Sequence, residues 1–217
     1  SSSRILHVSS SPPSVSIQAP SSGSFNNNAS GRVTFYFTPT QGAVALKNAS
    51  IFLNSTGTGR SVNASNSTDL TSATVNSITL PVNQGIADGS ATWLVQVCDV
   101  INQCANSSAS VIHVDTTSPV IAVNAPSSGI FINNATGRAT FYFTPTETQK
   151  LKNASLYLNS SGTGRAYNAS NSTDLTSGSV SSITLAASQG IADSSSTWLI
   201  QACDEANNCV NSSASVL

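Results

Sequence analysis

The clearest shortage in this 217-residue sequence is of electric charge, since only 8% of its residues are Asp, Glu, Lys or Arg. Lys and Arg number 8 and Asp and Glu number 9, which gives a formal net charge of −1. Nucleic-acid-binding surfaces need clustered Lys and Arg to neutralise phosphates, so we expect no nucleic acid as a partner. Methionine is absent, and no apolar run approaches the roughly 20 residues that cross a bilayer. We therefore expect no membrane span within this chain.

Residues that commonly perform catalysis are scarce as well. The two histidines, His7 and His113, occupy equivalent positions in a repeated segment, and neither has an evident Ser or Cys partner in the sequence. Paired carboxylates, a glycine-rich phosphate loop and a nucleophile triad are all missing from the pattern. The aspartates Asp99, Asp115 and Asp204 do not have calcium-loop spacing. The sequence therefore predicts no enzyme activity, no metal site and no cofactor.

What the sequence has in abundance is internal repetition. RILHVSSSPPSVSIQAP at residues 4–20 corresponds without a gap to SVIHVDTTSPVIAVNAP at residues 110–126. Later, GRVTFYFTPT matches GRATFYFTPT, and LKNASIFLN matches LKNASLYLN. A one-residue deletion before Leu151 changes the offset from 106 to 105, and Trp93 then aligns with Trp198. Each repeat of about 105 residues is long enough to form its own core.

Short apolar–polar alternations separated by Gly, Ser, Asn and Pro predict strands rather than helices. In one such segment Val33, Phe35 and Phe37 share a face, and in another Trp93 and Val95 do. The strands expected in the first repeat are Val15–Ala19, Val33–Thr38, Ser50–Leu53, Arg60–Asn63, Val75–Leu80, Thr92–Cys98 and Ser110–Val114. Seven short strands in about 105 residues predict an all-β fold, with one Greek-key β-sandwich in each repeat.

The four cysteines occur as two pairs with the same C-x5-C spacing, Cys98 with Cys104 and Cys203 with Cys209. Four cysteines allow three pairings, and the repetition favours a local bond within each pair. Disulfides persist in oxidising compartments, so these pairs predict an extracellular or cell-surface protein. A cysteine metal site is the alternative, but neither pair has a histidine near it in the sequence.

Twelve N-x-S/T sequons occupy equivalent positions in the two repeats and predict covalent glycans on an exported protein. The alternative is ordinary turn chemistry, because Asn and Ser favour turns. The candidate acceptors are Asn28, Asn48, Asn54, Asn63, Asn66 and Asn106 in the first repeat, and Asn134, Asn153, Asn159, Asn168, Asn171 and Asn211 in the second.

The run WLVQVCDVINQC followed by NSSASVIHVDTTSPVI resembles the tandem immunoglobulin-like repeats of archaeal and bacterial cell-surface proteins. The resemblance covers both repeats and implies two tandem immunoglobulin-like sandwiches in an extracellular setting. It implies no activity. The chain departs from antibody-type domains, because its cysteine pairs are not placed to join two sheets.

The division that we expect is an N-terminal strand and hinge at residues 1–12, a first domain at 13–117 and a second at 118–217. The second domain is expected to lack most of its last strand, since Val216 and Leu217 align with Val111 and Ile112. Residues 4–8 repeat that strand at the other end of the chain. We therefore expect a neighbouring copy to donate the residues Arg4, Ile5, Leu6, His7 and Val8 to an acceptor edge at Val216 and Leu217. The aliphatic pair Leu6 and Val8 is expected to point inward.

Strand donation of this kind resembles the donor-strand fibres of other extracellular systems, and it makes further copies of the chain the expected partner. The resulting hypothesis is a structural subunit of a glycosylated extracellular filament or surface fibre. The alternatives are a repeat segment of a larger adhesin or sugar-binding surface protein, and an accessory domain of a secreted enzyme. In an excerpt from a longer tandem array, the missing strand would be covalently continuous.

Overall fold

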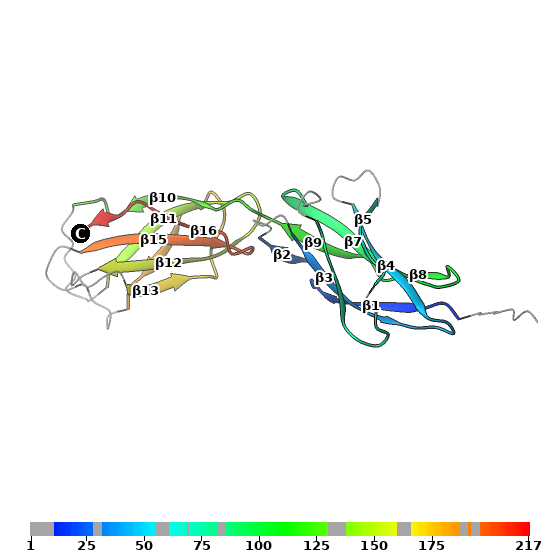
Figure 1. The fold of residues 1–217 in the computed structure, drawn as a ribbon. Helices are drawn as coiled ribbons and strands as arrows, with labels where there is room; N and C mark the ends of the chain where they lie inside the picture. Colours follow the sequence, from blue (N-terminus) through cyan, green and yellow to red (C-terminus); the bar gives the residue numbers. More distant parts are fainter. Residues whose placement is uncertain are drawn as a thin grey trace, which may run out of the picture. The chain divides into compact units, whose positions relative to one another are not determined.

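The computed structural model describes residues 11–27, 32–54, 61–68, 70–81, 86–129, 138–159, 166–186, 191 and 196–217. All regular elements in these ranges are β-strands (Figure 1), and no helix in them is long and apolar enough to cross a membrane. The chain divides into two compact units, Ser1–Asp115 and Thr116–Leu217. The expected N-terminal strand at residues 4–8 lies outside the described residues.

The first unit consists of two sheets. One has the order β1-β3-β6, and the other has the order β2-β9-β7-β4-β5 with β8 also paired to β7. The strand bounds are β1 Ser14–Ala19, β2 Ser24–Asn26, β3 Thr34–Thr40, β4 Leu46–Asn54, β5 Ser61–Asn66, β6 Asn76–Thr79, β7 Gly89–Asp99, β8 Cys104–Asn106 and β9 Ser110–Val114.

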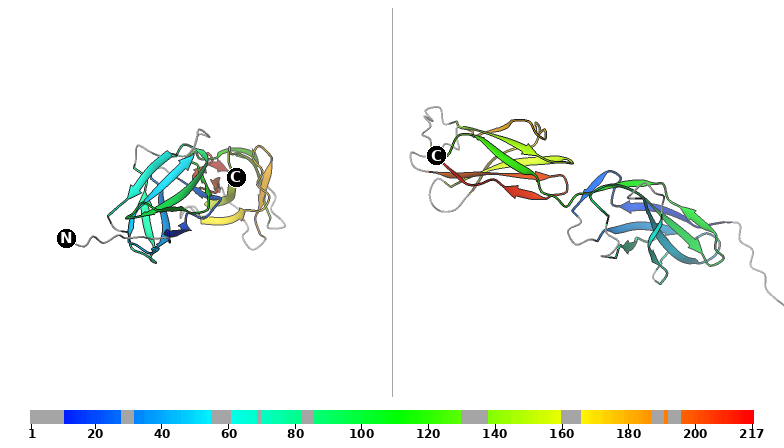
Figure 2. Two further views of the ribbon diagram at one scale, coloured as in Figure 1. Left: turned by 90° about the vertical axis from the view of Figure 1, so that its right-hand side faces the viewer. Right: turned by 90° about the horizontal axis from the view of Figure 1, so that it is seen from above.

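The second unit repeats this arrangement with the orders β10-β11-β14 and β13-β12-β15-β16, and β17 pairs with β15. Figure 2 gives two further views, in which the orange and red strands near the C-terminus lie side by side. The bounds are β10 Val120–Ala125, β11 Thr140–Thr146, β12 Leu151–Asn159, β13 Ala166–Asn171, β14 Ser181–Thr184, β15 Thr197–Asp204, β16 Cys209–Asn211 and β17 Ser215–Val216.

The core of each unit fills the space between its two sheets, as the alternating pattern predicts. Phe35 and Phe37 of β3 face Trp93 and Val95 of β7, and all four side chains are fully buried. Tyr36, between the two phenylalanines, points to solvent. Alternation along a strand therefore assigns inner and outer faces correctly here. The all-β tandem sandwich fold is confirmed.

Several strands differ in extent from the sequence-based expectation. β4 runs over Leu46–Asn54, which is longer than the expected Ser50–Leu53. The described first unit also contains two three-residue strands that were not expected, β2 and β8. Both are too short and too polar to show an alternating pattern. They form strands because β2 pairs with β9 and β8 pairs with β7.

Buried aspartates hold the hairpins that follow β7 and β15. Asp99 is 0% exposed, and its Oδ1 accepts the backbone N–H groups of Ile101 at 3.0 Å and Gln103 at 2.8 Å. In the second unit both carboxylate oxygens of Asp204 accept hydrogen bonds from Asn208, at 2.9 and 2.8 Å. These aspartates therefore satisfy hairpin donors that would otherwise lack an acceptor.

The Asp99→Ala and Asp204→Ala variants should each lower the free energy of unfolding by about 1–3 kcal/mol, because hairpin donors that are partly or fully buried lose their acceptor. Urea denaturation with the disulfides intact measures the change, and Asp174→Asn, a substitution at an exposed position, is the control. A loss below about 0.5 kcal/mol in both variants, no more than ordinary surface substitutions cause, would contradict this role.

Candidate functional site

The structure separates the candidate glycan acceptors by the exposure and hydrogen bonding of their sequons. Asn28 and Asn134 lie outside the described residues, and for Asn63 and Asn168 only the positions in β5 and β13 are described. The remaining eight sequon asparagines are described in full. They are Asn48, Asn54, Asn66 and Asn106 in the first unit, and Asn153, Asn159, Asn171 and Asn211 in the second.

Three sequons in each unit share the outer face of the larger sheet. Along β4 the buried Ala49, Ile51 and Leu53 point into the core, so Asn48 and Asn54 point outward. Alternation along β4 also places Ser50 and Phe52 on the outer face. Gln96 on β7 and Asn106 on β8 lie on the same face, because Ser50 pairs with Gln96, and Gln96 pairs with Asn106. The equivalent outer-face residues of the second unit are Asn153, Tyr157, Asn159, Gln201 and Asn211.

The sequons at Asn106 and Asn211 are held in the same way. Ser107, the middle residue, donates its backbone N–H to the Val95 carbonyl at 2.8 Å, and its Oγ accepts the Val95 N–H at 3.0 Å. Ser212 makes the corresponding pair of bonds to Ile200, at 2.8 and 3.0 Å. The middle residue is thus fixed against the central strand, while the asparagine and the third residue are both exposed.

At other sequons, one of the side chains needed for glycosylation is buried or hydrogen-bonded. The hydroxyl-bearing third residue of the Asn48 sequon, Ser50, is buried, and so is its counterpart Ser155. Asn171 uses Oδ1 to accept the N–H groups of Thr173 and Asp174, at 3.1 and 3.2 Å, and its Nδ2 donates to the Ser182 carbonyl at 3.1 Å. Such bonds are the turn chemistry that the sequence allowed as the alternative.

Both expected disulfides are present. Cys98 and Cys104 join β7 to β8, and Cys203 and Cys209 join β15 to β16, so each bond lies within one sheet. The chain contains no free cysteine. Local disulfides of this spacing reinforce a hairpin and leave no thiol for metal binding.

The histidine in the described part of the chain, His113, contacts residues of the two neighbouring strands. His113 stacks on Phe25 with ring centroids 4.7 Å apart, and its Nδ1 lies 2.8 Å from the Ser90 hydroxyl. These three residues meet because β9 lies between β2 and β7. His7 lies outside the described residues.

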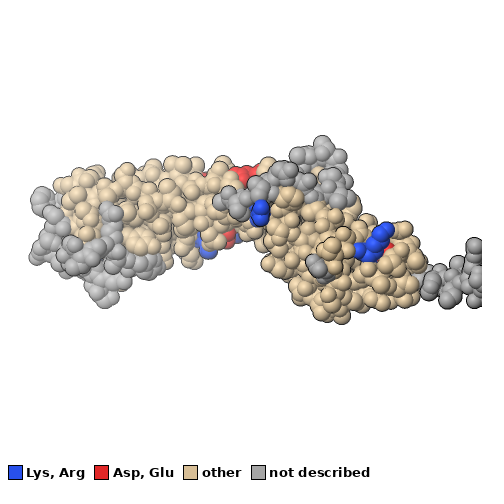
Figure 3. All heavy atoms as spheres, viewed as in Figure 1, with Lys and Arg blue, Asp and Glu red and all other residues tan. Residues whose placement is uncertain are grey.

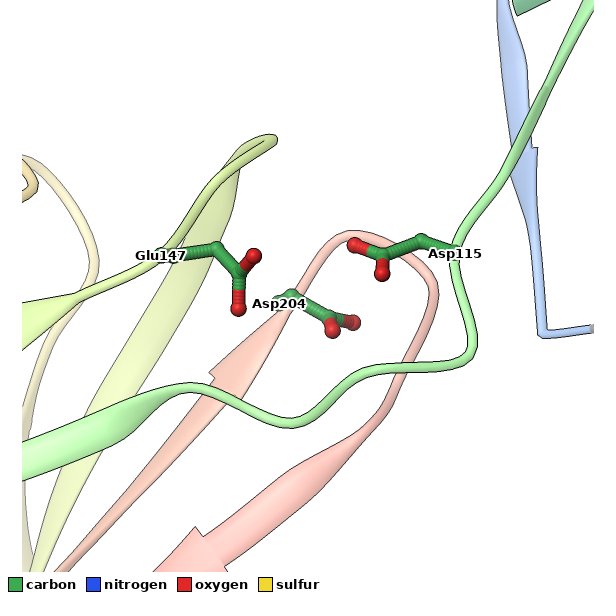
Figure 4. Close-up of side chains that lie close together, drawn as sticks. All are labelled: Asp115, Glu147 and Asp204. Carbon is green, nitrogen blue, oxygen red and sulfur yellow. The ribbon is translucent and has the colours of Figure 1, made fainter. Parts of the chain in front are cut away.

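Two buried carboxylates of the second unit lie close together, and the sequence had not indicated this. Oxygens of Glu147, after β11, and Asp204, at the end of β15, lie within 4.8 Å of each other (Figure 4). Carboxylate oxygens are ligands for hard cations such as Ca²⁺. Glu147 Oε1, however, already accepts the N–H groups of Thr148 and Gln149, at 2.5 and 3.2 Å, and Asp204 is bonded to Asn208. Glu147 Oε1 and both carboxylate oxygens of Asp204 thus already accept hydrogen bonds within their own loops.

Lys47 and Lys152 also make equivalent contacts. Their Nζ atoms donate to Oδ1 of Asn102 at 2.6 Å and of Asn207 at 2.5 Å. Both pairs are exposed, and each is a surface hydrogen bond from β4 or β12 to the loop of the hairpin that follows β7 or β15.

Two small clefts on the second unit each combine a tyrosine with a sequon asparagine. One of about 200 Å³ is lined by Tyr142, Asn171, Asp174, Val180, Ser181 and Ser182. The other, of about 240 Å³, is lined by Tyr157, Leu199, Gln201 and Asn211. Both are smaller than the roughly 300–1,000 Å³ of pockets for drug-sized ligands.

The surface around these features carries little charge. On the face shown in Figure 3, Lys, Arg, Asp and Glu form a few small spots among uncharged residues. Among the described residues one Lys–carboxylate ion pair occurs, Lys150 with Glu205 at 3.1 Å.

Comparison with known proteins identifies the fold and no family. No family model and no curated protein matches the sequence. Fibronectin(III)-like modules of Clostridium thermocellum CbhA superimpose with a TM-score of 0.52 at 13% identity, covering 94% of this chain and 91% of theirs.

Two further solved structures match with lower TM-scores. A 1.5-MDa bacterial ice-binding adhesin gives 0.44 at 19% identity, over 94% of this chain and 64% of the other. Chicken CNTN1 domains FN1–FN3 give 0.41 at 10% identity, over 91% and 66%. At such low identities the likeness concerns architecture alone.

We predict that Asn106 and Asn211 carry sugar in a larger fraction of molecules than Asn48 and Asn153. In the folded unit a transferase can reach both the asparagine and the third-residue hydroxyl at the first pair, whereas Ser50 and Ser155 are buried at the second. Quantitative glycopeptide mass spectrometry of native protein measures each occupancy. Equal or higher occupancy at Asn48 and Asn153 would contradict the prediction.

Proposed function

We propose that this chain is a structural subunit of a glycosylated extracellular filament or surface fibre. In this proposal residues 4–8 of one copy form a strand in the second unit of the next copy. The observation that supports it best is the role of the equivalent segment, β9, in the first unit.

β9 is an interior strand with two inward side chains. It pairs antiparallel with β7 over five residues and parallel with β2 over three. Ile112 and Val114 are both 0% exposed and belong to the core, while His113 points outward. The repeat places Leu6 and Val8 at these two inward positions. Residues 4–8 therefore have the side chains that such a groove requires.

In the second unit the corresponding place is held by a shorter segment. β17 pairs with β15 over two residues, and Leu217 exchanges backbone hydrogen bonds with Ser196 at 3.2 and 2.9 Å. Leu217 aligns with Ile112 and packs against the core. A donated strand in the β9 register would overlap residues 215–217, so it must displace them before it adds His7 and Val8.

The second repeat also retains the partners that a donated histidine would need. In the first unit His113 contacts Phe25 and Ser90, and these align with Phe131 and Ser195, which lie outside the described residues. His7 could therefore make the same stacking and hydrogen-bond contacts in a neighbouring copy. A head-to-tail contact between two different surfaces of identical chains generates an open polymer unless its rotation closes a ring.

An extracellular setting fits the covalent chemistry of the chain. The chain has two disulfides, and disulfides persist in oxidising compartments such as the extracellular space. Sugars on the outer face of the larger sheets would add hydration to a surface with few charges.

Replacing both Leu6 and Val8 by Ser should abolish assembly, because two polar side chains would enter the apolar groove. The single replacement Ile5→Ser is the matched control, since Ile5 aligns with the outward Val111 and should leave assembly intact. Negative-stain microscopy and sedimentation of the full chain measure filament formation.

Two outcomes would contradict strand donation by this segment. One is normal filaments after deletion of residues 1–9. The other is native material in which intact mass shows the polypeptide continuing past Leu217 into a covalently linked strand, as expected for a longer tandem array.

A further inference from the structure

The cleft beside Asn211 has the features of a binding place for a sugar attached to that residue. Tyr157 and Leu199 are directly opposite each other on β12 and β15 and form its apolar wall. Gln201 and Asn211, also opposite each other, form its polar side. The volume of about 240 Å³ suits one small ring rather than a drug-sized molecule.

Two hydrogen bonds orient the Asn211 side chain in this cleft. The Tyr157 hydroxyl donates to Gln201 Oε1 at 3.3 Å, and Gln201 Nε2 donates to Asn211 Oδ1 at 3.1 Å. With Oδ1 engaged by Gln201, the amide nitrogen Nδ2 of Asn211 is the atom that remains to carry an N-linked sugar. Asn211 and Ser213 are both exposed, whereas Ser212 is fixed to β15.

The apolar wall suits a sugar ring. The C–H groups on one face of a pyranose are apolar and pack against aromatic rings, while its hydroxyls bond to polar neighbours. Leu199 lies on the outer face of the sheet and is nevertheless only 7% exposed, so the side chains around it already form a recessed surface.

We infer that the first sugar linked to Asn211 packs against Tyr157 in this cleft and stabilises the second unit. The inference rests on the proposed glycosylation and adds a specific binding place for one glycan. The first unit offers a natural comparison, because Phe52 replaces Tyr157 while Gln96 still donates to Asn106 at 3.0 Å. A ring is therefore kept at this position in both units, and the hydroxyl is special to the second.

A double-mutant cycle on the full chain tests the packing. The variants are Asn211→Gln, Tyr157→Ser and their combination. Each is produced in the organism that glycosylates the native protein, and also in the periplasm of a bacterial host that adds no sugar. Thermal unfolding midpoints are then compared. In glycosylated protein, Asn211→Gln should lower the midpoint on the order of 4 °C when Tyr157 is present. It should lower it by much less in the Tyr157→Ser background.

The controls separate packing from simpler effects. Without glycosylation, Asn211→Gln should shift the midpoint equally in both backgrounds, apart from any coupling through Gln201. Tyr157→Phe keeps the ring and should keep most of the effect. Tyr142→Ser, on the outer face of the opposite sheet, should show no coupling to Asn211.

Each outcome decides a different point. Coupling of equal size in glycosylated and unglycosylated protein overturns the packing, while glycosylation stands. An unmodified Asn211 in a protein whose other sequons carry sugar overturns this inference alone. A native chain without any glycan overturns it together with the glycosylated part of the proposed function.

Discussion

The contact on which each unit depends is that between one phenylalanine and one tryptophan from opposite sheets. Phe35 of β3 meets Trp93 of β7 with ring centroids 4.5 Å apart, and Phe141 of β11 meets Trp198 of β15 at 4.8 Å. All four residues are fully buried. Because side chains alternate along a strand, this contact also fixes which residues face solvent, and a slip of one residue would reverse both faces.

That constraint explains which parts could be predicted from the sequence. The inner faces of β3 and β7 follow from alternation, and the local disulfides follow from a spacing that occurs twice. Alternation could also have placed Asn48 and Asn54 on one face of β4. Their grouping with Asn106 was not predictable, because it depends on the pairing of β4, β7 and β8. The meeting of Glu147 with Asp204 depends likewise on a tertiary approach between loops far apart in sequence.

The two sheets of each unit have outer faces of different chemistry. The larger sheet carries sequons, whereas the smaller one carries hydroxyl groups, some of them bonded to each other. Thr34 and Thr79 have their Oγ atoms 2.8 Å apart, and Thr140 and Thr184 repeat this at 2.9 Å. Cross-strand Thr pairs stabilise a sheet without adding charge. The low charge of the chain is thus compatible with a polar surface on both sides of the sandwich.

Comparison of the two units within one chain separates what the fold requires from what can vary. The Phe–Trp contact, the disulfide, the buried hairpin aspartate and the Ser107-type anchoring of the sequon are the same in both. Differences occur on the outer face, as with Phe52 and Tyr157, and at the loops, as with Gln41 and Glu147. They also occur in the core, where Val95 and Val97 of the first unit correspond to Ile200 and Ala202 of the second. One of these side chains gains a methylene group and the other becomes smaller. A core tolerates such apolar substitutions when its total volume and pattern are kept, so the two units retain one fold while their outer faces and loops diverge.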